Sequence, residues 1–265
     1  MLTRGTWWGT GSLIVPLLIG SGCSVRQSQP AVALERLPDT AAMADPRAAL
    51  TRMGGYLRTL KTFTIHAETT IDEVLADTGQ KLQFGGEAAL YYRAPAHLRV
   101  DVSSERKDRQ FFYDGKTLTV YGRRTGYYAS VPAPPAIREL LAAAEQKYDL
   151  DFPLADLFYW GTDKADLEDI KSSTYVGPNW VGGAACDHYA FRQQGVDWQL
   201  WIERGEAPLP RKLVITTTDD DAQPQYTATL TWRLTPGPDD ATFTFVPPPD
   251  ARRIILRERA PAGGN

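Results

Sequence analysis

The chain has 265 residues, is 43% hydrophobic and carries a formal net charge of −3 at pH 7. This length and hydrophobic content allow one large β-rich domain, or two smaller ones, with a sizeable core. The mild acidic excess argues against a nucleic-acid partner, which requires clustered basic residues, and two cysteines are too few for a disulfide framework.

The N-terminus carries a short apolar run, "GTWWGTGSLIVPLLIGSGC", preceded by a single charge at Arg4. Pro16 interrupts the run, which ends in small residues and is less continuous than the roughly 20 apolar residues of a membrane-spanning helix. The pattern is typical of a secretion signal, so we predict a signal peptide over 1–22. Residues 23–45 lack sustained periodicity and contain two prolines, which predicts a flexible tether.

The predicted domain opens with a helix. Asp45 is a suitable N-cap and Pro46 a suitable first helical residue. The apolar residues that follow at helical spacing are Leu50, Met53, Leu57 and Leu60. This helix should bury one stripe.

Strands follow, because from Thr62 the apolar period changes from about 3.6 to 2. A first antiparallel meander extends to about residue 132 and includes the hairpin dipeptide Asp114–Gly115. Helical spacing returns at Ile137, and "DFPLADLFYWG" predicts a second short helix. The second set of strands is expected at 173–177, 184–192, 196–203, 211–218, 224–235 and 242–246. This order predicts an α+β fold in which one strongly curved antiparallel sheet closes around the helices.

The stretch "CDHYAFRQQGVDWQLWIE" at 186–203 brings a cysteine, an aspartate and a histidine together. Side chains alternate along a strand, so Cys186 and His188 share one face while Asp187 lies on the other. The same alternation in the next strand puts Trp198 on the apolar face and Trp201 on the wetter one. The sequence also lacks the usual metal, phosphate and nucleophile motifs, so we predict no catalytic residues, no metal and no cofactor.

Several phrases, in their order, resemble the LolA-like proteins of the bacterial envelope. They are "LKTFTIHAETT", "YYRAPAHLRVDV", "FFYDGKTLTVY", "DWQLWIERGEAPLPRKLVIT" and "DDATFTFVPPPDARRI". Within that superfamily the chain looks most similar to a predicted periplasmic family of unknown function. The resemblance implies a domain over 46–256, an incomplete β-barrel with helices as a lid or plug, and an apolar cavity for acyl chains. Residues 257–265 are then a disordered tail.

The "SGC" before Ser24 resembles the lipobox of bacterial lipoproteins, although Gly20 stands where that pattern has leucine. The resemblance implies lipidation of Cys23, with Ser24 directing the protein to the outer membrane on the periplasmic side of a Gram-negative cell. Two alternatives remain: an ordinary signal cleaved nearby, or a disulfide between Cys23 and Cys186.

Inward-facing aromatic residues are the candidates for lining the cavity. They are Phe84, Tyr92, Tyr113, Trp198, Tyr226, Trp232 and Phe243. Aromatic residues line ligand pockets but also fill ordinary cores. We therefore expect a non-catalytic, envelope-anchored protein that binds a lipid or acyl chain. The alternative is an envelope sensor or interaction module with a protein partner and the same fold.

Overall fold

The computed structural model describes residues 45–160 and 167–258. The predicted signal peptide at 1–22, the lipidation candidate Cys23 and the predicted tether up to residue 44 lie outside the described residues, as does the predicted tail from 259 onward. Among the helices of the described ranges, none has the length and apolar character that crossing a membrane requires.

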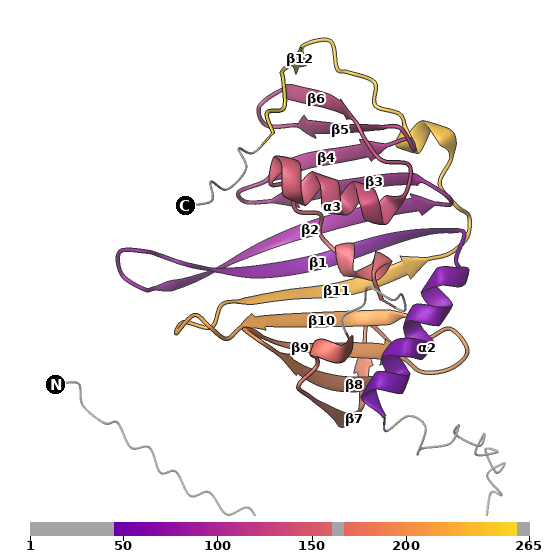
Figure 1. The fold of residues 1–265 in the computed structure, drawn as a ribbon, viewed down its shortest axis with the longest axis vertical. Coiled ribbons are helices and arrows are strands. Elements are labelled where there is room, and N and C mark those ends of the chain that lie inside the picture. Colours follow the sequence, from indigo (N-terminus) through magenta and orange to yellow (C-terminus); the bar gives the residue numbers. More distant parts are fainter. Residues whose placement is uncertain (1–44, 161–166, 259–265) are drawn as a thin grey trace, which may run out of the picture. The chain divides into compact units, whose positions relative to one another are not determined.

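Within the described ranges, twelve strands form one sheet (Figure 1). The strands are β1 (Thr62–Val74), β2 (Lys81–Arg93), β3 (His97–Ser104), β4 (Asp108–Tyr113), β5 (Thr117–Gly122), β6 (Tyr127–Pro132), β7 (Ser172–Val181), β8 (Ala184–Gln193), β9 (Val196–Glu203), β10 (Pro210–Thr217), β11 (Gln225–Arg233) and β12 (Arg252–Arg253). Their order is β12-β6-β5-β4-β3-β2-β1-β11-β10-β9-β8-β7. Neighbours pair antiparallel, except that β12 is parallel to β6. The sheet is open, because β12 and β7 are its edges and do not pair with each other.

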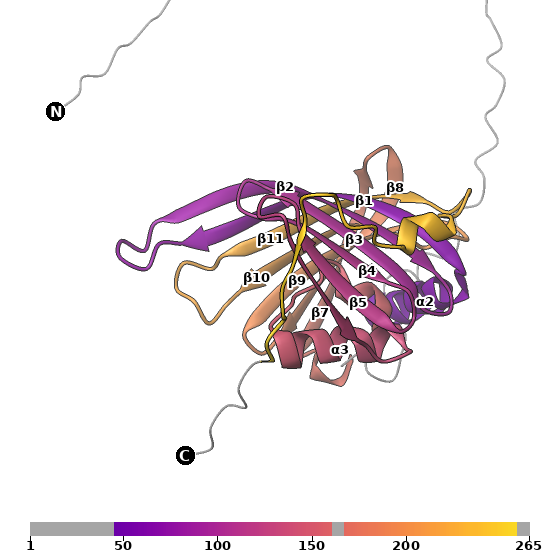
Figure 2. The ribbon, with the colours of Figure 1, turned by 90° about the horizontal axis from the view of Figure 1, so that it is seen from above.

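The topology consists of two meanders joined in the middle. Strands β1 to β6 proceed outward from the centre, and β7 to β11 return from the opposite edge until β11 pairs with β1. The chain therefore crosses the sheet between β6 and β7, and α3 (Ile137–Tyr148) belongs to this crossing. Figure 2 shows the sheet curving around the side that carries α2 (Pro46–Thr59) and α3. We call this side the concave face and the opposite side the convex face. The single antiparallel sheet with helices on one side confirms the predicted α+β fold.

The helices begin where the sequence predicts. Asp45 caps α2, since its Oδ1 accepts hydrogen bonds from the backbone N–H groups of Arg47 at 2.9 Å and Ala48 at 3.3 Å. The buried residues of α2 include Leu50, Met53 and Leu57 of the predicted stripe. The helix ends at Thr59, so Leu60 is its C-cap rather than its last helical residue.

Two predicted elements take a different form. The short helix expected in "DFPLADLFYWG" is only a 3₁₀ turn, η1 (Ala155–Phe158), and Leu154 before it adopts a left-handed conformation with φ of 62°, so the turn cannot extend toward Asp151. The strand expected at 242–246 is absent from the sheet. Its first residues form the 3₁₀ turn η3 (Asp240–Phe243), which the carboxylate of Asp239 caps by accepting from the Thr242 N–H. A third 3₁₀ turn, η2 (Leu167–Asp169), precedes β7.

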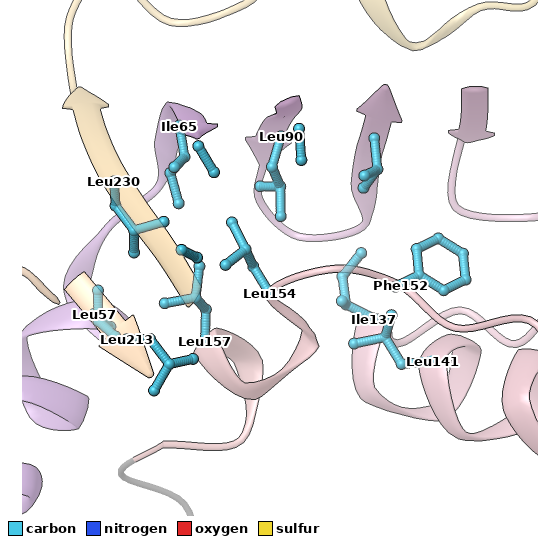
Figure 3. Close-up of a cluster of buried hydrophobic side chains, with 14 of the residues drawn as sticks. Leu57, Ile65, Leu90, Ile137, Leu141, Phe152, Leu154, Leu157, Leu213 and Leu230 are labelled. Atoms are coloured by element: carbon cyan, nitrogen blue, oxygen red, sulfur yellow. The ribbon is translucent and has the colours of Figure 1, made fainter. Parts of the chain in front are cut away.

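The main core lies between the concave face and the helices. Figure 3 shows Leu57 from α2, Ile137 and Leu141 from α3, and Leu154 and Leu157 from the crossing segment, all directed toward the strands. The sheet contributes Ile65, Leu90, Leu213 and Leu230, each at most 3% exposed. Burial of these side chains holds the helices on the sheet.

Candidate functional site

Three of the seven aromatic candidates belong to the packed core. Tyr113 is 1% exposed and its hydroxyl donates to the carbonyl of Pro134. Trp232 Nε1 donates to the carbonyl of Pro210 at 2.7 Å. The Tyr92 ring lies 4.9 Å from that of Phe63, and burial raises the pKa of Tyr92. Each of these side chains fills space beneath the helices.

Three other candidates form one line across the concave face. The strand register places Ile71 opposite both Phe84 and Tyr226, and Ile215 opposite both Tyr226 and Trp198. We call these five side chains the open row: Phe84, Ile71, Tyr226, Ile215 and Trp198. The row spans β2, β1, β11, β10 and β9, toward the strand ends that extend beyond the helices in Figure 1.

The open row is only partly covered. Ile71 is 46% exposed, and the other four side chains are half-buried. Trp198 stacks on the buried Phe191 with ring centroids 4.0 Å apart, and its Nε1 donates to Gln193 Oε1 at 2.8 Å. Ile215, Tyr226 and Trp198 also pack against the main core. The row is therefore an apolar surface that continues from the core into solvent.

One polar group of the row lies buried within it. The hydroxyl oxygen of Tyr226 is buried and has no hydrogen-bond partner among the described residues. Burial, and secondarily the negative charge of Asp156, raises the pKa of Tyr226 to about 12. Asp156, in η1, is exposed, yet desolvation by the surrounding protein raises its pKa.

The seventh candidate, Phe243, lies on the other side of the sheet, which corrects its predicted place in the cavity. Its ring is 5.0 Å from the Arg93 guanidinium and 5.4 Å from the His97 ring, whereas Tyr92 and Leu98 beside these residues face the core. Phe243 lines a separate groove of about 320 Å³ between β4 to β6 and the C-terminal segment, together with Phe112, Thr119 and Phe245. The chain folds back over this face after β11, and sequence alternation alone does not predict that return.

The stretch 186–203 folds as a hairpin whose alternation separates its reactive residues, as predicted. Asp187 is 2% exposed on the concave face, where it accepts from the Tyr175 hydroxyl at 2.8 Å and from Arg204. Cys186 is fully buried on the convex face, and burial raises the pKa of its thiol to about 11. His188 stacks on Trp201 at 3.9 Å. These groups do not converge on a common point.

A small second core on the convex face was not predicted. Cys186, Trp201 and Val214 are buried there, with Val181 and Ala184 packed against them. Trp201 is 7% exposed, and the Lys212 ammonium lies 4.9 Å from its ring. Trp201 therefore lies on the face that the sequence predicted, opposite Trp198, but the expectation that it is exposed to water there is wrong. The sequence did carry a signal for this second core: β8, β9 and β10 each have an apolar residue at an outward-facing position, namely Cys186, Trp201 and Val214.

Comparison with solved structures gives remote similarities. The lipoprotein LppX of Mycobacterium tuberculosis is 12% identical, with 76% of this chain and 100% of that chain covered at a TM-score of 0.46. An uncharacterized conserved protein of Thermus thermophilus is 13% identical, with coverages of 78% and 96% and a TM-score of 0.44. A LolA superfamily protein of Nitrosomonas europaea is 10% identical, with coverages of 75% and 97% and a TM-score of 0.30.

No curated protein matches the chain. A family model described as "Predicted periplasmic protein (DUF2092)" matches residues 47–257. This match covers more than half of the chain and confirms the resemblance to a predicted periplasmic family of unknown function. The chain belongs to this family of predicted periplasmic proteins.

Proposed function

We propose that the protein is a non-catalytic binder of lipids or acyl chains, and that the open row is its binding surface. The observation that carries the proposal is the half-exposed line of Phe84, Ile71, Tyr226, Ile215 and Trp198 on the concave face. Apolar surface removed from water contributes roughly 25 cal/mol per Å². An acyl chain laid along this row would cover side chains that the fold leaves in contact with solvent.

The N-terminus supplies the second half of the proposal. In the lipoprotein reading, Cys23 carries acyl groups and holds the domain at the periplasmic side of the outer membrane, where lipid ligands are abundant. Two anchoring signals or several acyl chains give stable attachment, since each buried methylene contributes about 0.8 kcal/mol. Intact-mass measurement of the membrane-extracted protein tests this. A mature protein without acyl groups would refute the anchor while leaving the binding surface untouched.

Binding is tested with N-phenyl-1-naphthylamine, an uncharged apolar dye that becomes fluorescent outside water. We expect saturable binding that Trp198→Ala weakens about tenfold, because losing roughly 60 Å² of apolar contact costs about 1.5 kcal/mol. Trp201→Ala is the matched control, since Trp201 lies three residues further along β9 but on the convex face. Its variant should bind the dye normally at a temperature where it remains folded.

Equal weakening by both tryptophan variants, or no saturable binding, would mean that the aromatic residues serve only to pack the fold. Either result would favour an envelope sensor or interaction module. One feature supports that second candidate: β7 is an edge strand with Val176 55% and Trp180 72% exposed, and residues 172–186 contain no charged side chain. Edge strands with exposed apolar residues are suited to pairing with another chain.

The second candidate is tested by placing a photo-crosslinking residue at Trp180 in β7. The control is the same residue at Tyr127 in β6, near the opposite edge of the sheet. Tyr127 is 42% exposed, so both positions are accessible. A partner at β7 should give one discrete adduct from position 180 in cells and none from position 127. Identical patterns at the two positions would argue against a partner at this edge.

A further inference from the structure

Two turns and a short strand bring basic residues together at one corner of the sheet. The Arg252 N–H donates to the Gly126 carbonyl at 2.8 Å, which joins β12 to the turn between β5 and β6. Arg124 of that turn donates from its guanidinium to the Glu105 carbonyl at 2.6 Å, which joins it to the turn between β3 and β4. We call this corner the basic rim, and its cations are Lys107, Arg109, Arg124, Arg252 and Arg253.

Most cations of the basic rim have no counter-ion in the chain. Four are exposed and form no ion pair among the described residues: Lys107, Arg109, Arg252 and Arg253. Arg124 binds backbone carbonyls, which leave its charge unneutralised. Nearby Asp108 is paired with Arg123, and the exposed Glu105 and Asp250 offset only part of the positive charge. The rim is therefore basic in a chain whose formal net charge is −3.

Apolar side chains are exposed among these cations. Ile254 and Ile255 follow Arg253 directly and are 47% and 88% exposed. Tyr127, opposite Arg252 in the pairing of β6 with β12, is 42% exposed. A soluble acidic partner would need only the charges, whereas a bilayer interface also accommodates aliphatic and aromatic side chains beside them. The composition of the rim therefore favours a membrane surface.

The basic rim adjoins one end of the open row. Strands β1 and β3 run in the same direction, because each is antiparallel to β2, so the turns that follow them lie at the same end of the sheet. Arg106, next to Lys107, lies 5.0 Å from the Phe84 ring and pairs with Glu73 near the end of β1. A surface that binds the rim would therefore approach the open row at Phe84.

We propose that the basic rim docks the domain on an anionic phospholipid bilayer. The arginine and lysine side chains bind head-group phosphates, while Ile254, Ile255 and Tyr127 enter the interface. Each basic residue near an anionic membrane surface increases partition roughly fivefold. This contact goes beyond the proposed binding of lipids by the row, because it requires neither an occupied row nor acyl groups on Cys23. It would hold the Phe84 end of the row against a bilayer.

Vesicle flotation tests the docking with the chain from residue 23 onward, carrying Cys23→Ser so that no acyl group contributes. Vesicles of dioleoylphosphatidylcholine containing about 30% dioleoylphosphatidylglycerol should capture the protein at about 50 mM NaCl, whereas vesicles of phosphatidylcholine alone should not. Raising the NaCl concentration to about 500 mM should release the protein, because salt screens exposed charges.

Charge removal at two places separates the rim from net charge. Arg252→Gln/Arg253→Gln should weaken partition about thirtyfold, from two basic residues at roughly fivefold each. Lys61→Gln/Arg233→Gln is the matched control, since these exposed residues lie at the opposite end of the sheet, where β1 begins and β11 ends. The control should float like the unmodified protein. Ile255→Ser should weaken partition about fivefold, through loss of roughly 40 Å² of apolar contact.

Equal capture by the two vesicle compositions, no capture at low salt, or equal weakening by the rim and control variants would each overturn the docking. Unchanged melting temperatures show that the variants are folded. The dye titration tests the open row separately: Arg252→Gln/Arg253→Gln should bind the dye normally, and Trp198→Ala should float normally. Capture without any dye binding would refute the lipid-binding row and leave the docking standing.

Discussion

The buried Asp187 and the half-buried Arg204 form an ion pair on the concave face, with Arg204 Nη2 2.6 Å from Asp187 Oδ1. The pair joins β8 to the β9–β10 connection, and the Tyr175 hydroxyl adds β7 by donating to the same oxygen at 2.8 Å. Asp187 thus has a structural role at the edge of the sheet instead of acting on its neighbour His188.

Replacing Asp187 with alanine should destabilise the protein by about 2–3 kcal/mol, because it leaves a largely buried guanidinium and a tyrosine hydroxyl without their acceptor. Urea denaturation measures the change. The Arg192–Asp197 pair is the control, since both partners are more exposed, and Asp197→Ala should have little effect. Similar losses for the two variants would show that burial of Asp187 does not determine its contribution.

Ile65 and Ile71 provide a matched comparison along β1. They lie on the same face of the same strand, but Ile65 is fully buried and Ile71 is 46% exposed. Ile65→Ala should cost about 3–4 kcal/mol and Ile71→Ala below about 1 kcal/mol. In dye titrations the order should reverse, with only Ile71→Ala weakening binding to the folded protein. A large stability loss at Ile71 would show that the open row is part of the packed core.

The Cys186 thiol should be unreactive in the folded protein. It is buried, and burial raises its pKa from 9.0 to about 11, so the reactive thiolate is scarce at pH 8. Maleimide labelling followed by peptide mass mapping should modify this residue only in denaturant. The shift also favours the protonated native state, so its stabilising contribution is lost as the pH rises from about 9 to about 11. Cys186→Ser should show a smaller loss of stability over that interval.

His188 should make the stability of the protein depend on pH in the opposite direction, with a loss at low pH. Desolvation, together with the nearby positive charge of Lys212, lowers its pKa below 6.5, whereas the hydrogen bond with Gln199 acts in the other direction. A lowered pKa in the folded state means that the stabilising contribution is present above pH 6.5 and lost as the pH falls through the folded value. Chemical denaturation at pH 7.5 and 5.0 should therefore show a larger decrease for the unmodified protein than for His188→Gln. Equal decreases would contradict the assignment.

The elements were predictable where local pattern and global fold agree. Asp45 and Pro46 mark the start of α2, and the strict alternation at 186–203 assigns Asp187 and His188 to opposite faces. The η1 turn was not predictable from helical spacing, because Leu154 takes a left-handed conformation that is unfavourable for its residue type. Leu154 and Leu157 pack into the core, and this burial offsets the free-energy cost of that conformation.

By itself the sequence predicted the order of α2, α3 and strands β1 to β11, the face on which side chains of the 186–203 hairpin lie, and the family. These properties depend on local periodicity, capping and turn residues, which act between positions close in the chain. The tertiary structure decided which aromatic residues share a surface. Tyr113 and Trp198 have the same inward parity, yet helices cover one and leave the other half-buried, while the returning C-terminal segment places Phe243 on the convex face. Coverage depends on where distant segments cross the sheet, and no local pattern encodes that crossing.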